Sequence, residues 1–298
     1  MTNPIEELLV YLEQLDDLSP SARQEVASVL RGWVDAQAVR QPAVAGEIPM
    51  QFDIVGESPV MQEVFSLLAK LSRADIPVLV LGESGTGKEL IASALHKYGP
   101  RRKKKLVAVN CAAIPANLLE AEIFGHMKGS FTGAHKDRIG YAQAADGGVL
   151  FLDEIGEIAF DLQAKLLRFL QDGEVRPVGS NITKKVNVRV VAATNQDILA
   201  QVQAGKFRED LYYRLAVFTL PLPPLRERKQ DIPHLAQYFL DKQQEASMPS
   251  AEISEEALEV LMAGQWPGNI RQLQNELLRA STFASAGKIE ASDLSENL

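Results

Sequence analysis

The segment Gly82-Glu-Ser-Gly-Thr-Gly-Lys88 has the residue types and the spacing needed to bind a phosphate. It follows an apolar run at 76–81 and precedes a helical pattern that begins at Glu89, where the general motif has Ser or Thr for magnesium. Between a strand and a helix, glycines let backbone N–H groups surround a phosphate, and a lysine reaches the β- and γ-phosphates. We therefore predict a nucleotide-binding loop, called the P-loop below, made of Gly82, Glu83, Ser84, Gly85, Thr86, Gly87, Lys88 and Glu89.

Two adjacent carboxylates, Asp153 and Glu154, follow the apolar run 149–152. The first can hold Mg²⁺, directly or through water, and the second can orient and deprotonate a water molecule that attacks the terminal phosphate. Another apolar run leads to Asn195, whose side chain could sense the γ-phosphate, although asparagine is also common in turns. Together with the P-loop, the pattern predicts an ATPase that uses ATP and Mg²⁺, with Asp153 as the metal ligand and Glu154 as the base.

A glycine-rich segment at 125–134 places Phe131 and Thr132 between Gly129 and Gly133. The segment contains too much glycine for a core helix, and a flexible loop that presents a large apolar side chain is expected to contact a partner. The alternative is that Phe131 folds back into the protein's own core. The residues alone leave both interpretations open.

Strand-like and helical segments alternate from about residue 50 onward. Apolar strand-like runs occur at 76–81, 106–110, 149–152, 186–194 and 217–220. Helical patterns occur between them at 60–71, 89–98 and 162–171. This alternation predicts an α/β fold with three layers and a largely parallel sheet.

The strand pattern stops after residue 224, and residues 230–284 read as helical, with Ser254 as a helix N-cap. We predict three parts. Residues 1–48 form a short leader of two helices and a linker, residues 49–224 form the α/β part, and residues 225–298 form a helical lid with a short tail.

Composition excludes several classes of protein. The 298 residues are 46% hydrophobic and 23% charged, with a net charge of −8, which argues against a disordered chain and against a dedicated DNA-binding domain. The lone Cys111, the acidic start and the lack of a long apolar run predict a cytoplasmic protein with no membrane segment. The basic run 101–105 is interpreted as a solvated turn between a helix and a strand, with contact to nucleic acid as the alternative.

Taken together, these motifs resemble the central AAA+ ATPase domain of bacterial enhancer-binding proteins, the NtrC-type activators of sigma-54 RNA polymerase. The resemblance spans residues 52–284. Residues 129–134 resemble the family's loop Gly-Ala-Phe-Thr-Gly-Ala, and residues 82–89 match its own P-loop, which ends in Glu. Residues 207–215 match the segment with two arginine fingers, and residues 266–273 match the second sensor of the lid.

The resemblance implies roles for individual residues. Arg208 and Arg214 would reach the nucleotide site of the neighbouring subunit, and Arg271 would contact nucleotide from the lid. Asn110 would hold Glu154 in check. Ile54 and Val55 would form the wall of the adenine pocket. The residues implied to contact sigma-54 are Gly129, Ser130, Phe131, Thr132, Gly133 and Ala134.

The implied activity is ATP-driven remodelling of the sigma-54 RNA polymerase holoenzyme, which promotes open-complex formation. The implied assembly is a homo-oligomer, a hexamer as in the family or a ring mixed with a related activator. Ser130 replaces the usual Ala of the loop and Met127 replaces a common Glu, so a different protein target is one alternative. A regulatory partner subunit of another activator is the second. The residues after the last lid helix are too few for a helix-turn-helix, so direct DNA binding is not expected from this chain.

Overall fold

The computed structural model describes residues 50–245, 251–284 and 287–295. The two helices predicted within residues 1–48, and the linker after them, lie outside the described residues. Within the described ranges, no helix combines the length and the apolar character needed to cross a membrane.

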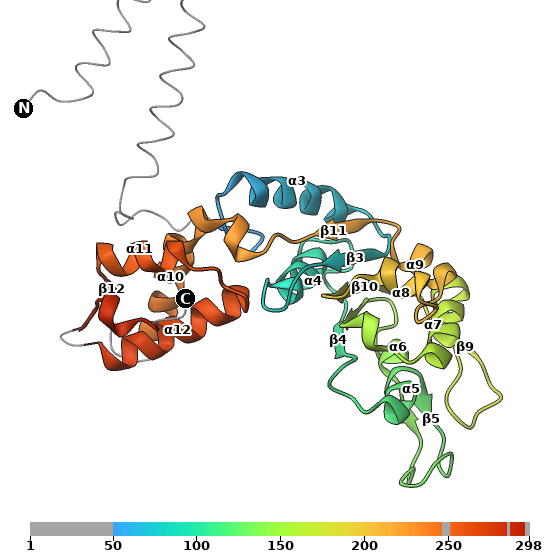
Figure 1. The fold of residues 1–298 in the computed structure, drawn as a ribbon. Coiled ribbons are helices and arrows are strands. Elements are labelled where there is room, and N and C mark those ends of the chain that lie inside the picture. Colours follow the sequence, from blue (N-terminus) through green and yellow to red (C-terminus); the bar gives the residue numbers. More distant parts are fainter. Residues whose placement is uncertain (1–49, 246–250, 285–286, 296–298) are drawn as a thin grey trace, which may run out of the picture. The chain divides into compact units, whose positions relative to one another are not determined.

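A five-stranded sheet forms the centre of the α/β part (Figure 1). Its strands are β3 (Val78–Leu81), β4 (Leu106–Asn110), β7 (Val149–Asp153), β10 (Arg189–Thr194) and β11 (Thr219–Pro221). The strand order is β11-β3-β10-β7-β4, and all neighbours run parallel. The five apolar runs in the sequence therefore supply the five strands, which confirms the predicted parallel sheet.

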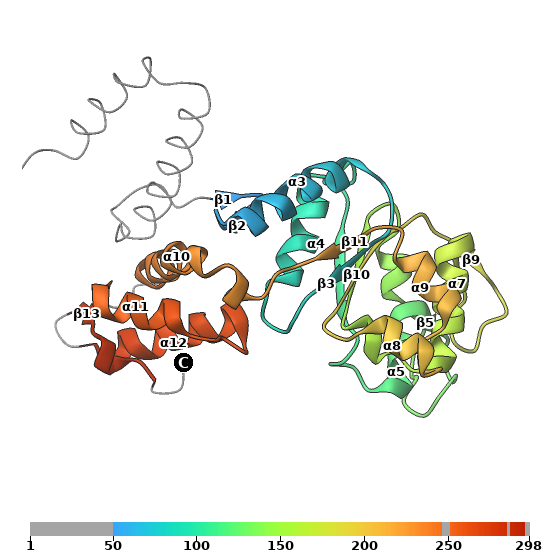
Figure 2. The ribbon, with the colours of Figure 1, turned by 45° about the horizontal axis from the view of Figure 1, so that its top comes forward.

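Side chains alternate between the two faces of this sheet, and each face has its own core. On one face, Val78, Val80 and Val191 pack against helices α3 (Pro59–Arg73) and α4 (Lys88–Lys97). On the other face, the apolar residues of the strands pack against α5 (Ala116–Phe124), α7 (Phe160–Asp172) and α9 (Glu209–Leu215). Figure 2 shows the two sets of helices on opposite sides of the strands, which confirms the three-layer prediction.

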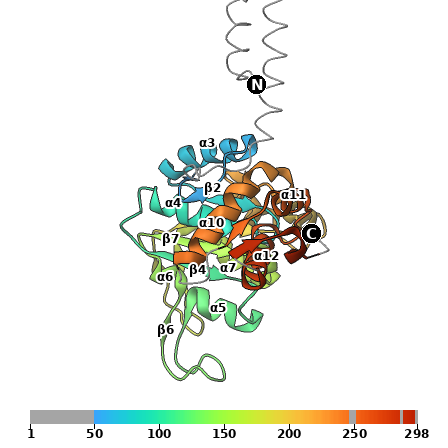
Figure 3. The ribbon, with the colours of Figure 1, turned by 90° about the vertical axis from the view of Figure 1, so that its left-hand side faces the viewer.

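Short elements connect and extend these layers. Antiparallel pairs are formed by β1 (Met50–Gln51) with β2 (Ile54–Val55), β5 (Gly125–His126) with β6 (Arg138–Ile139), and β8 (Glu174–Val175) with β9 (Lys184–Lys185). The remaining helices of this part are α6 (Tyr141–Ala144), α8 (Ile198–Gln203) and the 3-10 turn η2 (Ile155–Glu157). The glycine-rich segment projects beyond the β5–β6 pair (Figure 3).

The C-terminal residues form a helical part with a separate core. Two 3-10 turns, η3 (Leu225–Glu227) and η4 (Lys229–Asp231), lead into α10 (Ile232–Glu245), which is followed by α11 (Glu255–Ala263) and α12 (Asn269–Phe283). A short pair, β12 (Glu252–Ile253) with β13 (Lys288–Ile289), and the turn η6 (Ala291–Asp293) complete this part. Trp266 is fully buried in its core. Ser254 caps α11 as predicted, since its Oγ accepts the backbone N–H of Ala257 at 3.1 Å.

A buried carboxylate joins the root of this helical part to the start of α3. Asp231 is fully buried, and its oxygens accept the N–H groups of Glu57 and Ser58 and the Ser58 hydroxyl, each at 2.8 Å. A helix start leaves N–H groups without internal partners, so Asp231 supplies acceptors near the N-terminus of α3 from a distant part of the chain.

One residue of the basic run differs from its interpretation as a solvated turn. Arg101 forms a two-pronged ion pair with Asp75, at 2.9 and 2.7 Å, and also donates to the carbonyl oxygens of Gly148 and Asn187. Arg101 therefore connects residues 75, 148 and 187 at the edge of the sheet opposite the P-loop. The other four residues of the run lie in the turn between α4 and β4.

Candidate functional site

The P-loop connects the end of β3 to the first residue of α4. Gly85 and Gly87 have φ angles of 78° and 99°, which only glycine adopts without strain, and Gly87 directly precedes the helix. The first N–H groups of α4 have no partner within the helix, and such a helix start attracts anions. Lys88 is 6% exposed, and its Nζ donates to the carbonyl oxygens of Gly82 and Glu83 at 2.9 and 3.3 Å. This donor set fits the phosphates of a nucleotide.

The aligned ends of the parallel strands bring Glu154 and Asn195 to the P-loop. A Glu154 carboxylate oxygen lies 3.5 Å from the Nζ of Lys88, and the other accepts the backbone N–H of Asn195 at 3.3 Å. Glu154 has φ 52° and ψ 49°, a left-handed conformation that is rare for a residue with a side chain. Strained backbone of this kind is concentrated at functional sites.

Asp153 lies at the end of β7, opposite Asn110 at the end of β4. The side-chain nitrogen of Asn110 is 3.5 Å from an Asp153 oxygen, while its oxygen accepts the N–H groups of Ala112 and Ala113 at 3.0 Å. Burial raises the pKa of Asp153, and the negative charge of Glu154 raises it further. A cation beside Asp153 would offset both effects.

The oxygen atoms at this edge of the sheet also fit a magnesium ion that is brought in by a nucleotide. Within the described residues, no group of three or more His, Cys, Asp or Glu side chains could hold a metal alone. Magnesium commonly uses one or two carboxylates and takes its other ligands from phosphates and water. Asp153 can supply such a carboxylate, whereas the hydroxyl of Thr86 is already bonded to the carbonyl oxygen of Glu83 at 2.8 Å.

The start of α12 contacts the P-loop backbone directly. The N–H groups of Ile270 and Arg271 donate to the carbonyl oxygen of Gly85 at 3.0 and 3.4 Å. The buried side chain of Asn269 donates to the Ser84 carbonyl at 3.0 Å, and Arg271 reaches the Ser84 hydroxyl at 3.3 Å. Arg271, predicted from the resemblance to contact nucleotide, therefore lies beside the P-loop.

Two arginines at the start of the C-terminal helical part, here called the lid root (residues 225–231), also contact the P-loop. Arg226 forms a two-pronged ion pair with Glu83 at 2.8 and 2.6 Å, and Asn269 donates to the same carboxylate at 3.1 Å. The hydrogen bonds from Arg226 and then Asn269 lower the pKa of Glu83 to about 2. Arg228 is buried and donates to the Thr86 carbonyl at 3.1 Å. Burial lowers the pKa of Arg228 to about 10, so it stays positive at neutral pH.

Sequence reasoning did not identify Arg226, Arg228 and Asn269 as part of the site. They lie more than 135 residues from the P-loop, so no local pattern connects them to it. Two signals were present: a cluster of basic residues shortly after β11, the last strand of the central sheet in the chain, and an asparagine in a Pro-Gly-Asn turn, where Asn269 adopts φ 52°.

Ile54 and Val55, predicted to line an adenine pocket, are both buried in β2. Ile54 packs in the core of the α3–α4 face, and Val55 packs in the core of the C-terminal helical part. A cavity of about 360 Å³ at the carboxyl ends of β3 and β10 includes Gly82, Glu83 and Asn195 in its lining.

The hydrogen-bond partners of the Arg208 and Arg214 side chains lie in α9 and α7 and not in this chain's own P-loop. Arg208 precedes α9 and pairs with Asp210 at 3.0 and 2.7 Å, while Arg214 donates to the Leu170 carbonyl at 3.0 and 2.9 Å. In the part of the chain that the structure describes, no hydrogen bond or ion pair connects either guanidinium to residues 82–89.

The loop at 129–134 is closed by its own hydrogen bonds. The N–H of Gly129 donates to the Ala134 carbonyl at 2.8 Å, and that of Ala134 donates to the Phe131 carbonyl at 3.0 Å. The half-buried Phe131 ring lies 5.0 Å from the His126 ring, edge to face, so it folds onto the base of its own loop and not into a core cluster. Thr132 is exposed.

Residues 178–179, called the supporting segment below, contact the base of this loop. The N–H of Met127 donates to the Val178 carbonyl at 2.9 Å, and the N–H of Val178 donates to the Gly125 carbonyl at 2.8 Å. Ser130 lies against Gly179, and its buried hydroxyl has no hydrogen-bond partner among the described residues. The extra hydroxyl at this position is therefore buried and not in contact with solvent.

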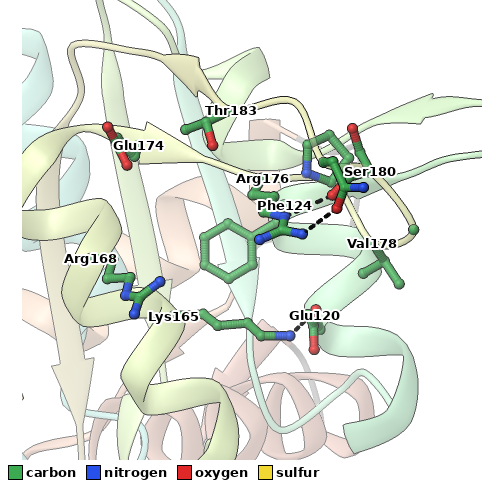
Figure 4. A pocket seen from close by; sticks show the side chains of 12 residues that line it. Glu120, Phe124, Lys165, Arg168, Glu174, Arg176, Val178, Ser180 and Thr183 are labelled. Carbon is green, nitrogen blue, oxygen red and sulfur yellow. Dashed lines mark hydrogen bonds and ion pairs between the residues drawn. The ribbon is translucent and has the colours of Figure 1, made fainter.

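A cavity of about 560 Å³ adjoins the supporting segment and is lined from α5, α7 and β8 (Figure 4). Glu120 and Lys165 form an ion pair at its edge, and Phe124 lines the cavity together with Arg168 and Arg176. Its lining includes no residue of the P-loop and neither Asp153 nor Glu154. This cavity is therefore not part of the site built around Lys88.

Comparison with known proteins agrees with this geometry. Residues 54–221 match the sigma-54 interaction domain, and residues 226–298 match an AAA+ ATPase lid domain. The Nif-specific regulatory protein of Azotobacter vinelandii is 52% identical over 246 residues, which cover 83% of this chain and 47% of that protein. The DNA-binding transcriptional regulator NtrC of Klebsiella pneumoniae is 47% identical over 276 residues, which cover 92% of this chain and 59% of NtrC.

Among solved structures, NtrX from Brucella abortus in complex with ADP superposes with a TM-score of 0.76 at 29% identity, covering 98% of this chain and 62% of NtrX. The chain spans about half the length of the curated relatives named above. The P-loop, the strand-end carboxylates and these matches lead to one conclusion: the chain belongs to the sigma-54 interaction domain family of AAA+ proteins.

Proposed function

We propose that this chain binds and hydrolyses ATP and uses the energy to remodel the sigma-54 RNA polymerase holoenzyme. The observation that carries the proposal is the meeting of Lys88, Glu154 and Asn195 at one edge of the sheet, directly beside the P-loop. The ADP in the solved NtrX structure and the sigma-54 interaction domain match support it.

In the proposed reaction, P-loop N–H groups and Lys88 bind the phosphates. Lys88 cannot pair equally well with a phosphate and with Glu154, so phosphate binding would free the carboxylate to orient and deprotonate water. Asp153 would hold Mg²⁺, which balances phosphate charge when bound. Asn195 would orient groups near the terminal phosphate, and Asn110 would fix Asp153, and through it the adjacent Glu154.

At the adenine end of the nucleotide, Ile54 and Val55 would contact the base. At the phosphate end, Arg271 would add a contact from the lid. On this proposal residues 49–224 form the ATPase part and residues 225–298 form the lid, with residues 1–48 preceding them.

Arg208 and Arg214 would complete the site of a neighbouring copy in a ring, which we propose to be a hexamer. Their side chains are held by Asp210 and by the Leu170 carbonyl, and not by this chain's P-loop. An arginine supplied from a neighbour stabilises the negative charge that develops on the transferred phosphoryl group.

The loop at 129–134 would contact sigma-54, with Phe131 and Thr132 as its contact residues. Thr132 is exposed, whereas Phe131 is folded onto His126 and would have to leave that ring to reach a partner. The two alternatives, a different target protein and a regulatory partner subunit, lack the support that the family match gives to sigma-54.

The role of Glu154 is tested by replacing it with an uncharged amide. Glu154→Gln should lower ATP turnover about 10²–10⁴-fold, because the base is lost, while nucleotide binding persists. Phosphate release measures turnover, and calorimetry measures binding. Glu157→Gln, an exposed carboxylate three residues further on, is the matched control and should keep its activity. Turnover by Glu154→Gln within about threefold of the unaltered chain would contradict the assignment.

The arrangement of the arginines is tested by mixing two inactive variants. Arg208→Ala alone should lower turnover about 10³-fold or more. Mixing it with Glu154→Gln should restore measurable turnover, because one interface in a mixed ring combines an intact Glu154 with an intact Arg208. A mixture that stays as inactive as its components, although the two variants are shown to co-assemble, would exclude action between copies.

The loop is tested by Thr132→Ala. This variant should keep ATP turnover within about twofold, since Thr132 is exposed and makes no part of the P-loop site, but should abolish open-complex formation on a sigma-54 promoter. Thr282→Ala, an exposed threonine on α12, serves as the control. Normal open-complex formation by Thr132→Ala would disprove the loop assignment.

A further inference from the structure

We propose that Arg226 is a positioning residue that, together with Asn269, holds the P-loop in its nucleotide-binding shape through the side chain of Glu83. This inference rests on the proposed nucleotide binding and adds a device that couples the loop to the lid. It assigns to Glu83 a role different from direct contact with phosphate.

The backbone carbonyl of Glu83 is the centre of the internal hydrogen bonds of the P-loop. Its carbonyl oxygen accepts from the Thr86 N–H at 3.4 Å, from the Thr86 hydroxyl at 2.8 Å and from the Nζ of Lys88 at 3.3 Å. A change in the orientation of Glu83 therefore moves the lysine that binds phosphate.

The side chain of Glu83 is held from the lid side by three N–H donor groups. The fork of Arg226 contacts both carboxylate oxygens, at 2.6 and 2.8 Å, and Asn269 contacts one of them at 3.1 Å. A planar guanidinium on a planar carboxylate fixes orientation as well as distance. Asn269 is itself fixed, since it is fully buried and its oxygen accepts the Leu225 N–H at 2.7 Å.

The ion pair between Arg226 and Glu83 contributes little to global stability. The Arg226 and Glu83 side chains are 38% and 42% exposed, and exposed ion pairs stabilise a fold only weakly. Both groups are charged at neutral pH, because the pKa of Glu83 is about 2. The fixed geometry should therefore affect nucleotide affinity more than the unfolding temperature.

The test is Arg226→Ala in the full chain, with ADP as the probe. ADP affinity measured by calorimetry should fall about three- to tenfold, the KM for ATP should rise by a similar factor, and kcat should change by less than about twofold. The midpoint of thermal unfolding should stay close to that of the unaltered chain. Lys242→Ala, which removes the exposed pair with Glu245 within α10, is the matched control and should change none of these values.

A double-mutant cycle with Glu83→Gln separates positioning from direct contact. If Arg226 acts through Glu83, the combined variant should bind ADP no more weakly than the weaker single variant. Arg226→Lys keeps the charge but loses the fork, and its affinity should lie between those of Arg226→Ala and the unaltered chain.

Unchanged ADP affinity in Arg226→Ala would overturn the inference, and so would additive effects in the cycle, which would mean that Arg226 does not act through Glu83. A large fall in unfolding temperature that fully accounts for the weaker binding would also overturn it. Failure of the unaltered chain to bind ADP is a separate outcome, which would refute the proposed function itself.

Discussion

The contact between the P-loop and the start of α12 constrains the rest of the site. Gly85 has φ 78°, and a Cβ there would overlap the carbonyl oxygen of Gly268, so only glycine allows the two backbones to approach this closely. The Gly85 carbonyl in turn accepts the N–H groups of Ile270 and Arg271 in the first turn of α12, which have no partners inside their helix. Residues 83–86 are each contacted by the lid or its root, so loop and lid cannot change independently.

The charges at the sheet edge complement this mechanical connection. Lys88 is almost fully buried, and its charge is balanced by Glu154 and by carbonyl dipoles. When a phosphate pairs with Lys88, Glu154 loses its ion-pair partner. Because a buried charge without a partner is costly, Glu154 must then form another interaction. The strained backbone of Glu154 and the raised pKa of Asp153 are features that concentrate at functional sites, and they support the proposed binding of charged groups at this edge.

Most of the fold was predictable because its signals are local. Five apolar runs gave five strands, the glycines and Lys88 marked the P-loop, and Ser254 marked a helix start. The other contacts depend on segments that are distant in sequence. Arg226 contacts Glu83, and Asp231 contacts Ser58, only after the chain has folded. The same holds for the pair of Arg101 with Asp75 at the edge of the sheet opposite the P-loop. Periodicity and spacing carry no information about such pairings.

The most direct measurement of the central claim, that the P-loop and the start of α12 respond to nucleotide as one unit, is amide hydrogen exchange with and without ADP. The account predicts slower exchange at residues 83–88 and also at residues 269–272, where α12 begins on the Gly85 carbonyl. Residues 255–263 of α11 serve as the internal control and should be unaffected. Protection limited to residues 83–88, with unchanged exchange at 269–272, would contradict the account.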